Sequence, residues 1–358
     1  MEFDGYLGTD DRDWETTADG TLRVAIVGLG WWSRERVLPA LADLENCAAT
    51  VGVSGSSAKR EQVVADWPSV EHGLSYDEFA AGEAVGAYDA VYVCTPNALH
   101  LPHVETAAEF GKAVLCEKPM EASVERAERL VAACQAEDVP LMVGYRMQTD
   151  RAARAVRRLV REGVVGDPVT VHAHMSQPIA EMFDDPSHWR LDPDLAGAGA
   201  SVTDLGVYPI NTSRFVLDAD PEAVTASTWS SESEWFERVP DERASFQLAF
   251  PDGVTALCSV SQNAYKTAEF RVVGTAGEVR MRPGFFGAQE NELLLSTPVG
   301  ETSVTYEPAD QMRELFCFFA DRVLAGKTIP ADGQHGLVDM HVVEAVYDAA
   351  EDETRRKL

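Results

Sequence analysis

The segment GLGWWS at positions 28–33 has the spacing of a turn that binds a pyrophosphate. Gly28 permits a tight turn after a strand, and Gly30 allows the backbone to approach phosphate oxygens closely. Ser33 stands where such turns usually have a third glycine, and it is still small enough for helix and strand to pack. A helix that begins here offers free N–H groups to an anion. We therefore expect Gly28, Gly30, Trp31 and Trp32 to border a bound dinucleotide.

The end of the second apolar run indicates which dinucleotide binds. NAD sites usually place a carboxylate there, which binds the ribose 2′-hydroxyl. This chain has hydroxyl groups and two cations instead, and these favour a 2′-phosphate. The residues concerned are Ser54, Gly55, Ser56, Ser57, Lys59 and Arg60. The sequence favours NADP over NAD; the alternative is a polar helix start that prefers neither cofactor.

Two later apolar runs also end in polar residues. Doubly wound sheets bind ligands at the carboxyl ends of their strands. We therefore expect cofactor contacts from the residues that follow these runs, which are Thr95, Pro96, Asn97, His100 and Glu117. Lys118 comes next and reaches the same crevice. The alternative for the first segment is a turn with a helix cap, and the alternative for Glu117 and Lys118 is a surface ion pair.

Asp204, Tyr208 and Asn211 stand four and seven residues apart, so an α-helix would place them on one face. Apolar neighbours, among them Val202 and Ile210, indicate that this helix is largely covered. A carboxylate and a phenol on a covered helix need polar partners. The simpler alternative is a polar helix face without a ligand.

Alternating strands and helices must position the first set of residues. Apolar runs at 22–27, 48–53, 89–94, 113–116 and 141–143 predict strands, and helices are expected near 35–44, 57–66, 99–110 and 123–137. Continuous Val/Ile-rich runs separated by helices indicate a parallel sheet covered on both faces. Right-handed crossovers then give an α/β, doubly wound Rossmann domain over residues 21–145.

An α+β domain is expected over residues 146–358. A helix near 151–161, a strand at 169–174, an irregular acidic stretch at 180–195 and a helix at 200–217 come first. A large, mostly antiparallel open sheet follows, with strands at 223–230, 243–250, 254–262, 269–273, 277–282, 292–296 and 302–306. Its free face is a candidate surface for a homo-oligomer. Helices near 310–325 and 335–350 should pack back on the body, and residues 1–20 should form an N-terminal arm.

The charge excludes several classes of partner. Thirty basic and 59 acidic residues give a net charge of -29, which disfavours nucleic-acid binding and docking to anionic membranes. Such self-repulsion is best tolerated where salt screens it, so we expect a salt-adapted protein, the alternative being an ordinary acidic enzyme.

No basic, apolar leader and no run of bilayer length is visible. The six cysteines lack metal-like spacing, and His172 and His174 lack a third ligand, so we expect reduced thiols, no metal and a cytoplasmic location.

Together, these segments resemble the glucose-fructose oxidoreductase/inositol dehydrogenase family of two-domain dehydrogenases. GLGWWS, SGSSAK, TPNALH and EKP occur in that family's order and approximate spacing. The resemblance continues through 144–146, 188–190 and 204–211 and covers nearly all of the chain after residue 20. Tyrosine rather than histidine at position 208, with Trp189 and Arg190 upstream, is similar to the sugar-oxidising branch. That branch includes NADP-dependent D-xylose 1-dehydrogenases. The acidic composition of this chain is similar to that of such dehydrogenases from salt-loving microbes.

The resemblance implies NADP-dependent oxidation of an aldopyranose at C1 to its 1,5-lactone, with D-xylose as the first candidate. It implies that Lys118, Asp204 and Tyr208 act together on the sugar. Tyr208 would be the acid/base and Lys118 the cation bonded to substrate oxygen and cofactor ribose, or the two roles would be exchanged. Asn211 and Tyr145 would contact the sugar, while Arg146, Trp189 and Arg190 would border the cofactor. Alternatives are dehydrogenation of glucose, inositol or a cyclic diol, coupled oxidation and reduction of two sugars, and a non-catalytic ligand sensor.

Overall fold

The computed structural model describes residues 12–14, 20–287 and 289–358, and contacts divide the chain into two compact units. The parallel-sheet unit comprises Arg12–Arg146 and Asp310–Leu337, and the mixed-sheet unit comprises Met147–Ala309 and Val338–Leu358. Residues 310–337 were expected in the second domain. They belong to the first instead, because α11 (Gln311–Ala325) buries its apolar face against β1 and β2. The predicted N-terminal arm lies outside the described residues except for 12–14 and 20, of which Trp14 packs on Phe318 of α11.

The parallel-sheet unit is the predicted doubly wound fold. Six parallel strands have the order β3-β2-β1-β4-β5-β6. They are β1 (Leu22–Val27), β2 (Cys47–Val53), β3 (His72–Leu74), β4 (Ala90–Val93), β5 (Ala113–Cys116) and β6 (Leu141–Val143). The helices are η1 (Ser33–Val37, a π-helical turn), α2 (Leu38–Ala42), α3 (Ser57–Asp66), α4 (Tyr76–Ala80), α5 (His100–Glu109) and α6 (Val124–Ala136). Strand β3 and helix α4 were not predicted, because they are too short to give a periodic pattern.

Local chemistry explains where these helices begin. The hydroxyl of Ser123 accepts a hydrogen bond from the backbone N–H of Arg126 and so caps α6. The buried positions of α6 then recur at helical spacing, at Val124, Ala127, Leu130, Val131 and Cys134. This amphipathic pattern holds α6 against α5.

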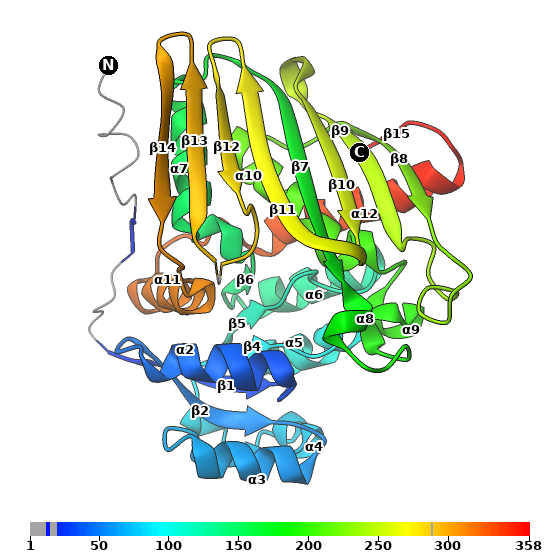
Figure 1. The fold of residues 1–358 in the computed structure, drawn as a ribbon. Helices are drawn as coiled ribbons and strands as arrows, with labels where there is room; N and C mark the ends of the chain where they lie inside the picture. Colours follow the sequence, from blue (N-terminus) through cyan, green and yellow to red (C-terminus); the bar gives the residue numbers. More distant parts are fainter. Residues whose placement is uncertain (1–11, 15–19, 288) are drawn as a thin grey trace. The chain divides into compact units, whose positions relative to one another are not determined.

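The mixed-sheet unit contains nine strands in the order β14-β13-β12-β11-β7-β10-β9-β8-β15 (Figure 1). All neighbours are antiparallel except β10 and β7, so the expected mostly antiparallel sheet is confirmed. The strands are β7 (Pro168–Pro178), β8 (Ala223–Trp229), β9 (Arg243–Ala249), β10 (Thr255–Ser261), β11 (Asn263–Gly274), β12 (Glu278–Arg282), β13 (Asn291–Thr297), β14 (Gly300–Tyr306) and β15 (Arg356–Lys357). The longer helices are α7 (Arg151–Arg161), α10 (Val207–Leu217) and, from Val338 onward, α12 (Gly333–Glu351). Helix α10 continues the π-helical turn η6 (Val202–Gly206).

One face of the nine-stranded sheet is open. Helices α7 and α10 pack against the sheet, and Figure 1 shows them behind it. Burial alternates along β9 and β10, as expected when one sheet face is covered. On the open face, Trp229 and Leu257 are 48% and 42% exposed.

All six cysteines lie in the described part of the chain and are free thiols, most of them buried. Within residues 12–14, 20–287 and 289–358, no helix combines the length and the apolar character needed to cross a bilayer.

Candidate functional site

The glycine turn after β1 has the geometry that a phosphate group requires. Gly28 has a φ of +101°, and a Cβ there would lie 2.4 Å from the backbone oxygen of Cys94. A Cβ on Gly30, by contrast, would meet no atom within 4 Å, so the backbone at Gly30 faces open space. The hydroxyl of Ser33 donates to the backbone oxygen of Gly28 at 2.5 Å and closes the turn, which explains why serine can replace the third glycine.

Two further features of this turn fit a dinucleotide. A continuous helix of residues 31–42 begins directly after Gly30, and its first N–H groups have no partner within the helix. The side chain of Thr95, at the end of β4, lies beside Gly28, and its hydroxyl is buried without a hydrogen-bond partner among the described residues. A buried hydroxyl of this kind is suited to a polar ligand. The residues present therefore fit the phosphates and ribose of a dinucleotide.

At the end of β2, the predicted residues divide into two sets. Arg60 donates to the backbone oxygen of Ser54 at 2.6 Å, and Ser56 caps α3, so these residues shape the loop. Ser57 and Lys59 are exposed at the start of α3, and the first turn of that helix holds no acidic residue. This arrangement leaves a hydroxyl and an ammonium group accessible where a 2′-phosphate would lie.

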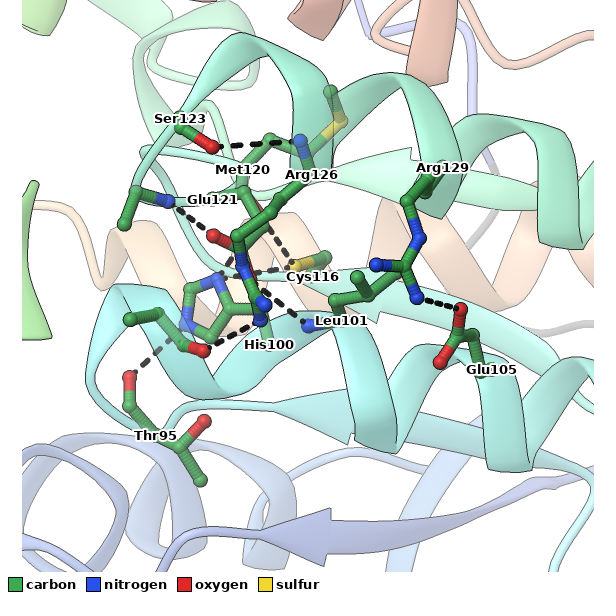
Figure 2. A network of polar contacts seen from close by, with 12 residues as sticks. Thr95, His100, Leu101, Glu105, Cys116, Met120, Glu121, Ser123, Arg126 and Arg129 are labelled. Carbon is green, nitrogen blue, oxygen red and sulfur yellow. Dashed lines mark hydrogen bonds and ion pairs between the residues drawn. The ribbon is translucent and has the colours of Figure 1, made fainter.

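His100, which was expected to contact the cofactor, is held between two loops of its own unit. Its side chain is fully buried. Its two ring nitrogens lie 2.9 Å from the backbone oxygen of Thr95 and 3.1 Å from that of Met120 (Figure 2). The ring therefore joins two loops and presents no surface to a ligand. Asn97 is also buried, and Pro96 precedes the short helix η3 (Asn97–Leu99).

The two residues after β5 are fixed by a buried tyrosine. The carboxylate of Glu117 accepts from the hydroxyl of Tyr92 at 2.7 Å and from the backbone N–H of Lys118 at 3.2 Å. Tyr92 in turn packs on Phe316 of α11. A Cβ on Gly144 would lie 3.3 Å from Glu117, so the glycine leaves room for this carboxylate. Glu117 therefore orients the loop that presents the half-buried Lys118.

The predicted residues Tyr145 and Arg146 pack within the same unit. The ring of Tyr145 is buried and meets the ring of His335 edge-on, with the centroids 5.7 Å apart. The guanidinium of Arg146 lies 5.4 Å from the ring centre of Trp32, next to Trp31, which is 56% exposed. The exposed ring beside the glycine turn can cover a bound cofactor.

In the mixed-sheet unit, Asp204 lies in the π-helical turn η6 that precedes α10. Its carboxylate accepts from the amide of Gln262 at 2.9 Å and pairs with Arg190 at 3.3 Å. The α-helical spacing used to relate Asp204 to Tyr208 does not apply unchanged across a π-helical turn. Such turns are frequent at functional sites, and nothing in the sequence pattern marked this one.

The predicted Trp189–Arg190 pair also acts inside this unit. The guanidinium of Arg190 lies 4.4 Å from the ring centre of Trp189 and 5.6 Å from that of Phe183. His188 stacks on Phe183 at 3.8 Å, and burial lowers the pKa of His188 to about 4. Arg190 therefore links an aromatic cluster to Asp204, a residue expected to bind sugar.

Tyr208 and Asn211 differ in their surroundings. Tyr208 is 9% exposed, and its ring lies 5.9 Å from that of Phe285. Asn211 is buried; its amide donates to Asp339 at 2.7 Å and accepts from Gln148 at 3.1 Å. The amide of Asn211 therefore has partners at both ends within its own unit, and its contact with a sugar stays a prediction.

Asp241, which no sequence pattern predicted, caps the helix that carries Asp204. Its buried carboxylate accepts from the backbone N–H groups of Ala200 and Val202 at 2.6 and 2.7 Å and from the hydroxyl of Tyr347 at 2.8 Å. A Cβ on Gly199 would lie 2.3 Å from this carboxylate. Burial raises the pKa of Asp241 to about 6. No local pattern could reveal a cap supplied by a residue so distant in the chain.

The histidine pair of β7 includes His174, whose ring is bonded to two hydroxyl groups. The ring nitrogens of His174 lie within hydrogen-bond distance of the hydroxyls of Ser259 and Ser176. No cluster of three or more metal-ligating side chains occurs in the described part of the chain.

Comparison with known proteins agrees with this architecture. Residues 22–145 match the model of the oxidoreductase family with an NAD-binding Rossmann fold, and residues 153–280 match the GFO/IDH/MocA C-terminal domain. The chain is 48% identical over 353 residues to D-xylose 1-dehydrogenase [NADP(+)] of Haloarcula marismortui, covering 98% of each protein. It is 30% identical to D-xylose 1-dehydrogenase (NADP(+)) 2 of Haloferax volcanii, covering 91% of this chain and 96% of that protein.

A solved structure of an oxidoreductase is also similar to this chain over nearly its whole length. The crystal structure of aldose-aldose oxidoreductase from Caulobacter crescentus has a TM-score of 0.87 and 32% identity, and the match covers 94% of this chain and all of that one. The similarity extends through both units, including the segments that hold Lys118, Asp204 and Tyr208. The chain therefore belongs to the GFO/IDH/MocA family of oxidoreductases.

Proposed function

We propose that this protein oxidises D-xylopyranose at C1 to D-xylono-1,5-lactone with NADP as the acceptor. The observation that carries the proposal is the 48% identity, over nearly the whole of both chains, to an NADP-dependent D-xylose 1-dehydrogenase. The exposed Ser57 and Lys59, without a carboxylate in the first turn of α3, support NADP. The charge of -29 supports a high-salt cytoplasm as the place of action.

In this proposal, Tyr208, Lys118 and Asp204 each have a separate role in the oxidation of the sugar. Oxidised nicotinamide supplies a hydride acceptor when it is bound. The C1–H bond of the sugar breaks with its electron pair leaving as hydride, the C1–O1 bond becomes a carbonyl, and the O1 proton passes to the protein. The phenolate form of Tyr208 accepts this proton and becomes the phenol, and the ammonium of Lys118 donates a hydrogen bond to O1. Asp204, held by Arg190 and Gln262, orients a sugar hydroxyl.

The direct test is a screen for NADPH formation with pentoses, hexoses and inositols in concentrated potassium chloride. D-xylose should give the highest kcat/KM, and turnover of an inositol or a hexose in its place would redirect the assignment. Tyr208→Phe removes only the hydroxyl and should lower kcat by about 10²-fold or more. An unchanged kcat in that variant would transfer the proton-accepting role to Lys118.

A second candidate reaction is supported by the similarity to an aldose-aldose oxidoreductase. An enzyme of that kind couples the oxidation of one aldose to the reduction of another and has no need to release its cofactor. The absorption spectrum of the purified protein separates the two reactions. A cofactor that survives gel filtration and dialysis would favour the coupled reaction, and a cofactor-free protein would favour the dehydrogenase.

The open sheet face supports a homo-oligomer. Trp229 and Leu257 lie on that face, and the guanidinium of Arg243 covers the Trp229 ring at 4.1 Å. An exposed surface with large apolar side chains is typical of a contact between subunits. A second copy of the chain is the proposed partner.

A further inference from the structure

His100 connects the two loops that follow β4 and β5 (Figure 2). It is the first residue of α5, and its side chain has no exposed surface. Nε2 lies 2.9 Å from the backbone oxygen of Thr95, and Nδ1 lies 3.1 Å from that of Met120. The thiol of Cys116 lies 3.4 Å from Nδ1 and thus closes the remaining side of the ring. One imidazole therefore contacts the end of β4, the end of β5 and the loop beyond it.

A buried ion pair fastens the same loops at a second point. The side chain of Glu121 is fully buried, and its carboxylate accepts from Arg126 at 2.8 and 2.9 Å and from the backbone N–H of Leu101 at 3.3 Å. Arg126 also donates to the backbone oxygen of Ala98 at 2.7 Å. The segment 120–121 is thus attached to the start of α5 by two independent sets of hydrogen bonds. Met120 is the attachment point nearer to Lys118.

The carbonyl of Met120, which His100 contacts, lies close to Lys118 in the chain. Only Pro119, whose ring restricts φ, separates Met120 from Lys118. Movement of the Met120 carbonyl is therefore transmitted to Lys118 with little chance of local compensation. Thr95, at the other end of the bridge, borders the glycine turn.

We propose that His100 is a positioning residue: its ring forms a bridge between the loops of Thr95 and Met120, donates a hydrogen bond from Nδ1 to the backbone oxygen of Met120, and so holds the Lys118 ammonium in its working position relative to the cofactor turn. The assignment of Lys118 to the substrate rests on the function proposed above, whereas the bridge itself does not. A displacement of about 1 Å in a reacting group can cost about 10²-fold in rate, so loss of the bridge should be visible in turnover.

Two amide variants separate the contributions of the two ring nitrogens. Asparagine places its amide nitrogen where Nδ1 of histidine lies, and glutamine places its amide nitrogen near the position of Nε2. His100→Asn should keep the contact to Met120 and retain most of kcat. His100→Gln should lose that contact and lower kcat by about 10-fold or more, with the KM for NADP little changed. Val104→Ala, in the buried face of α5, is the matched control: it should lower Tm without lowering kcat.

Hydrogen exchange gives a readout that does not depend on activity. The backbone amides of residues 117–122 should exchange faster in His100→Gln than in wild type, His100→Asn or Val104→Ala. Equal exchange and equal kcat in all four proteins would overturn the proposal, and so would a loss of kcat in His100→Asn but not in His100→Gln. If wild type oxidises no aldose, the proposed function fails, and the exchange rates still decide whether His100 holds the loop.

Discussion

Lys118 and Lys112 lie at opposite ends of the same short strand and offer a matched test of the proposed chemistry. Lys118 follows β5, where Glu117 orients its backbone, and Lys112 precedes β5 and donates to the backbone oxygen of Tyr88. Lys118→Ala should lower kcat for D-xylose by at least about 10²-fold, because the hydrogen bond to O1 is lost. Lys112→Ala should leave kcat close to wild type. A steady-state assay of NADPH formation with both variants measures this, and equal losses would show that Lys118 has no special role.

Lys59 is the residue proposed to set the preference for NADP over NAD. Lys59 is exposed at the start of α3, whereas Arg60 is bonded to the backbone of Ser54. Lys59→Ala should raise the KM for NADP by about 10-fold and change the KM for NAD little, since only NADP carries the 2′-phosphate. Arg60→Ala should raise both values, because the whole loop loses its support. KM values for both cofactors decide the matter, and parallel changes in the Lys59 variant would remove it from the phosphate site.

At the scale of elements, sequence patterns succeeded where the signals are local. The observed bounds of α3 and α7 agree with those predicted, because Ser56 and Asp150 cap these helices within their own first turns. The observed bounds of β5 also match the predicted ones. The π-helical turns of η1 and η6 were not predicted, because they depend on packing around the helix rather than on residue spacing. The bonding of His100 and Asn211 to buried partners was missed for the same reason.

Asp241 makes the stability of the helix that carries Asp204 depend on pH. Its pKa of about 6 in the folded protein lies above the ordinary value of 3.8, mainly because it is buried. A raised pKa means that the folded state binds the proton more tightly, so this contribution to stability is complete below about pH 4 and is lost as the pH rises towards 6. The free energy of unfolding of wild type, relative to Asp241→Asn, should therefore fall across this window and stay constant above it.

Urea titrations at a series of pH values measure this difference directly. Tyr347→Phe is a suitable control, because it removes the hydroxyl that donates to Asp241 but leaves the titrating carboxylate in place. That variant should be less stable than wild type and should still lose stability between about pH 4 and 6. Identical pH dependence in wild type and Asp241→Asn would contradict the assignment of the raised pKa to Asp241.

At the scale of the whole molecule, the two sheets were predictable and the course of the chain between the units was not. The alternation of strands and helices before residue 146, and its absence afterwards, gave the fold class correctly. The return of α11 to the parallel-sheet unit has no signal in its own sequence, because an apolar helix face specifies burial but not the partner. The parallel pairing of β10 with β7 is likewise a long-range choice that neither strand encodes alone.

The proposed assembly belongs to this largest scale and depends on the open sheet face. Trp229 and Leu257 lie on that face, whereas Val299, 79% exposed, lies in the turn between β13 and β14. Leu257→Glu, alone or with Trp229→Glu, should lower the molar mass measured by light scattering, since a buried carboxylate without a partner is costly in an interface. Val299→Glu should leave the mass unchanged. Because net charge opposes association, the wild-type mass should also fall at low potassium chloride. A monomeric wild type in concentrated salt, or a mass insensitive to Leu257→Glu, would show that subunits do not meet through this face.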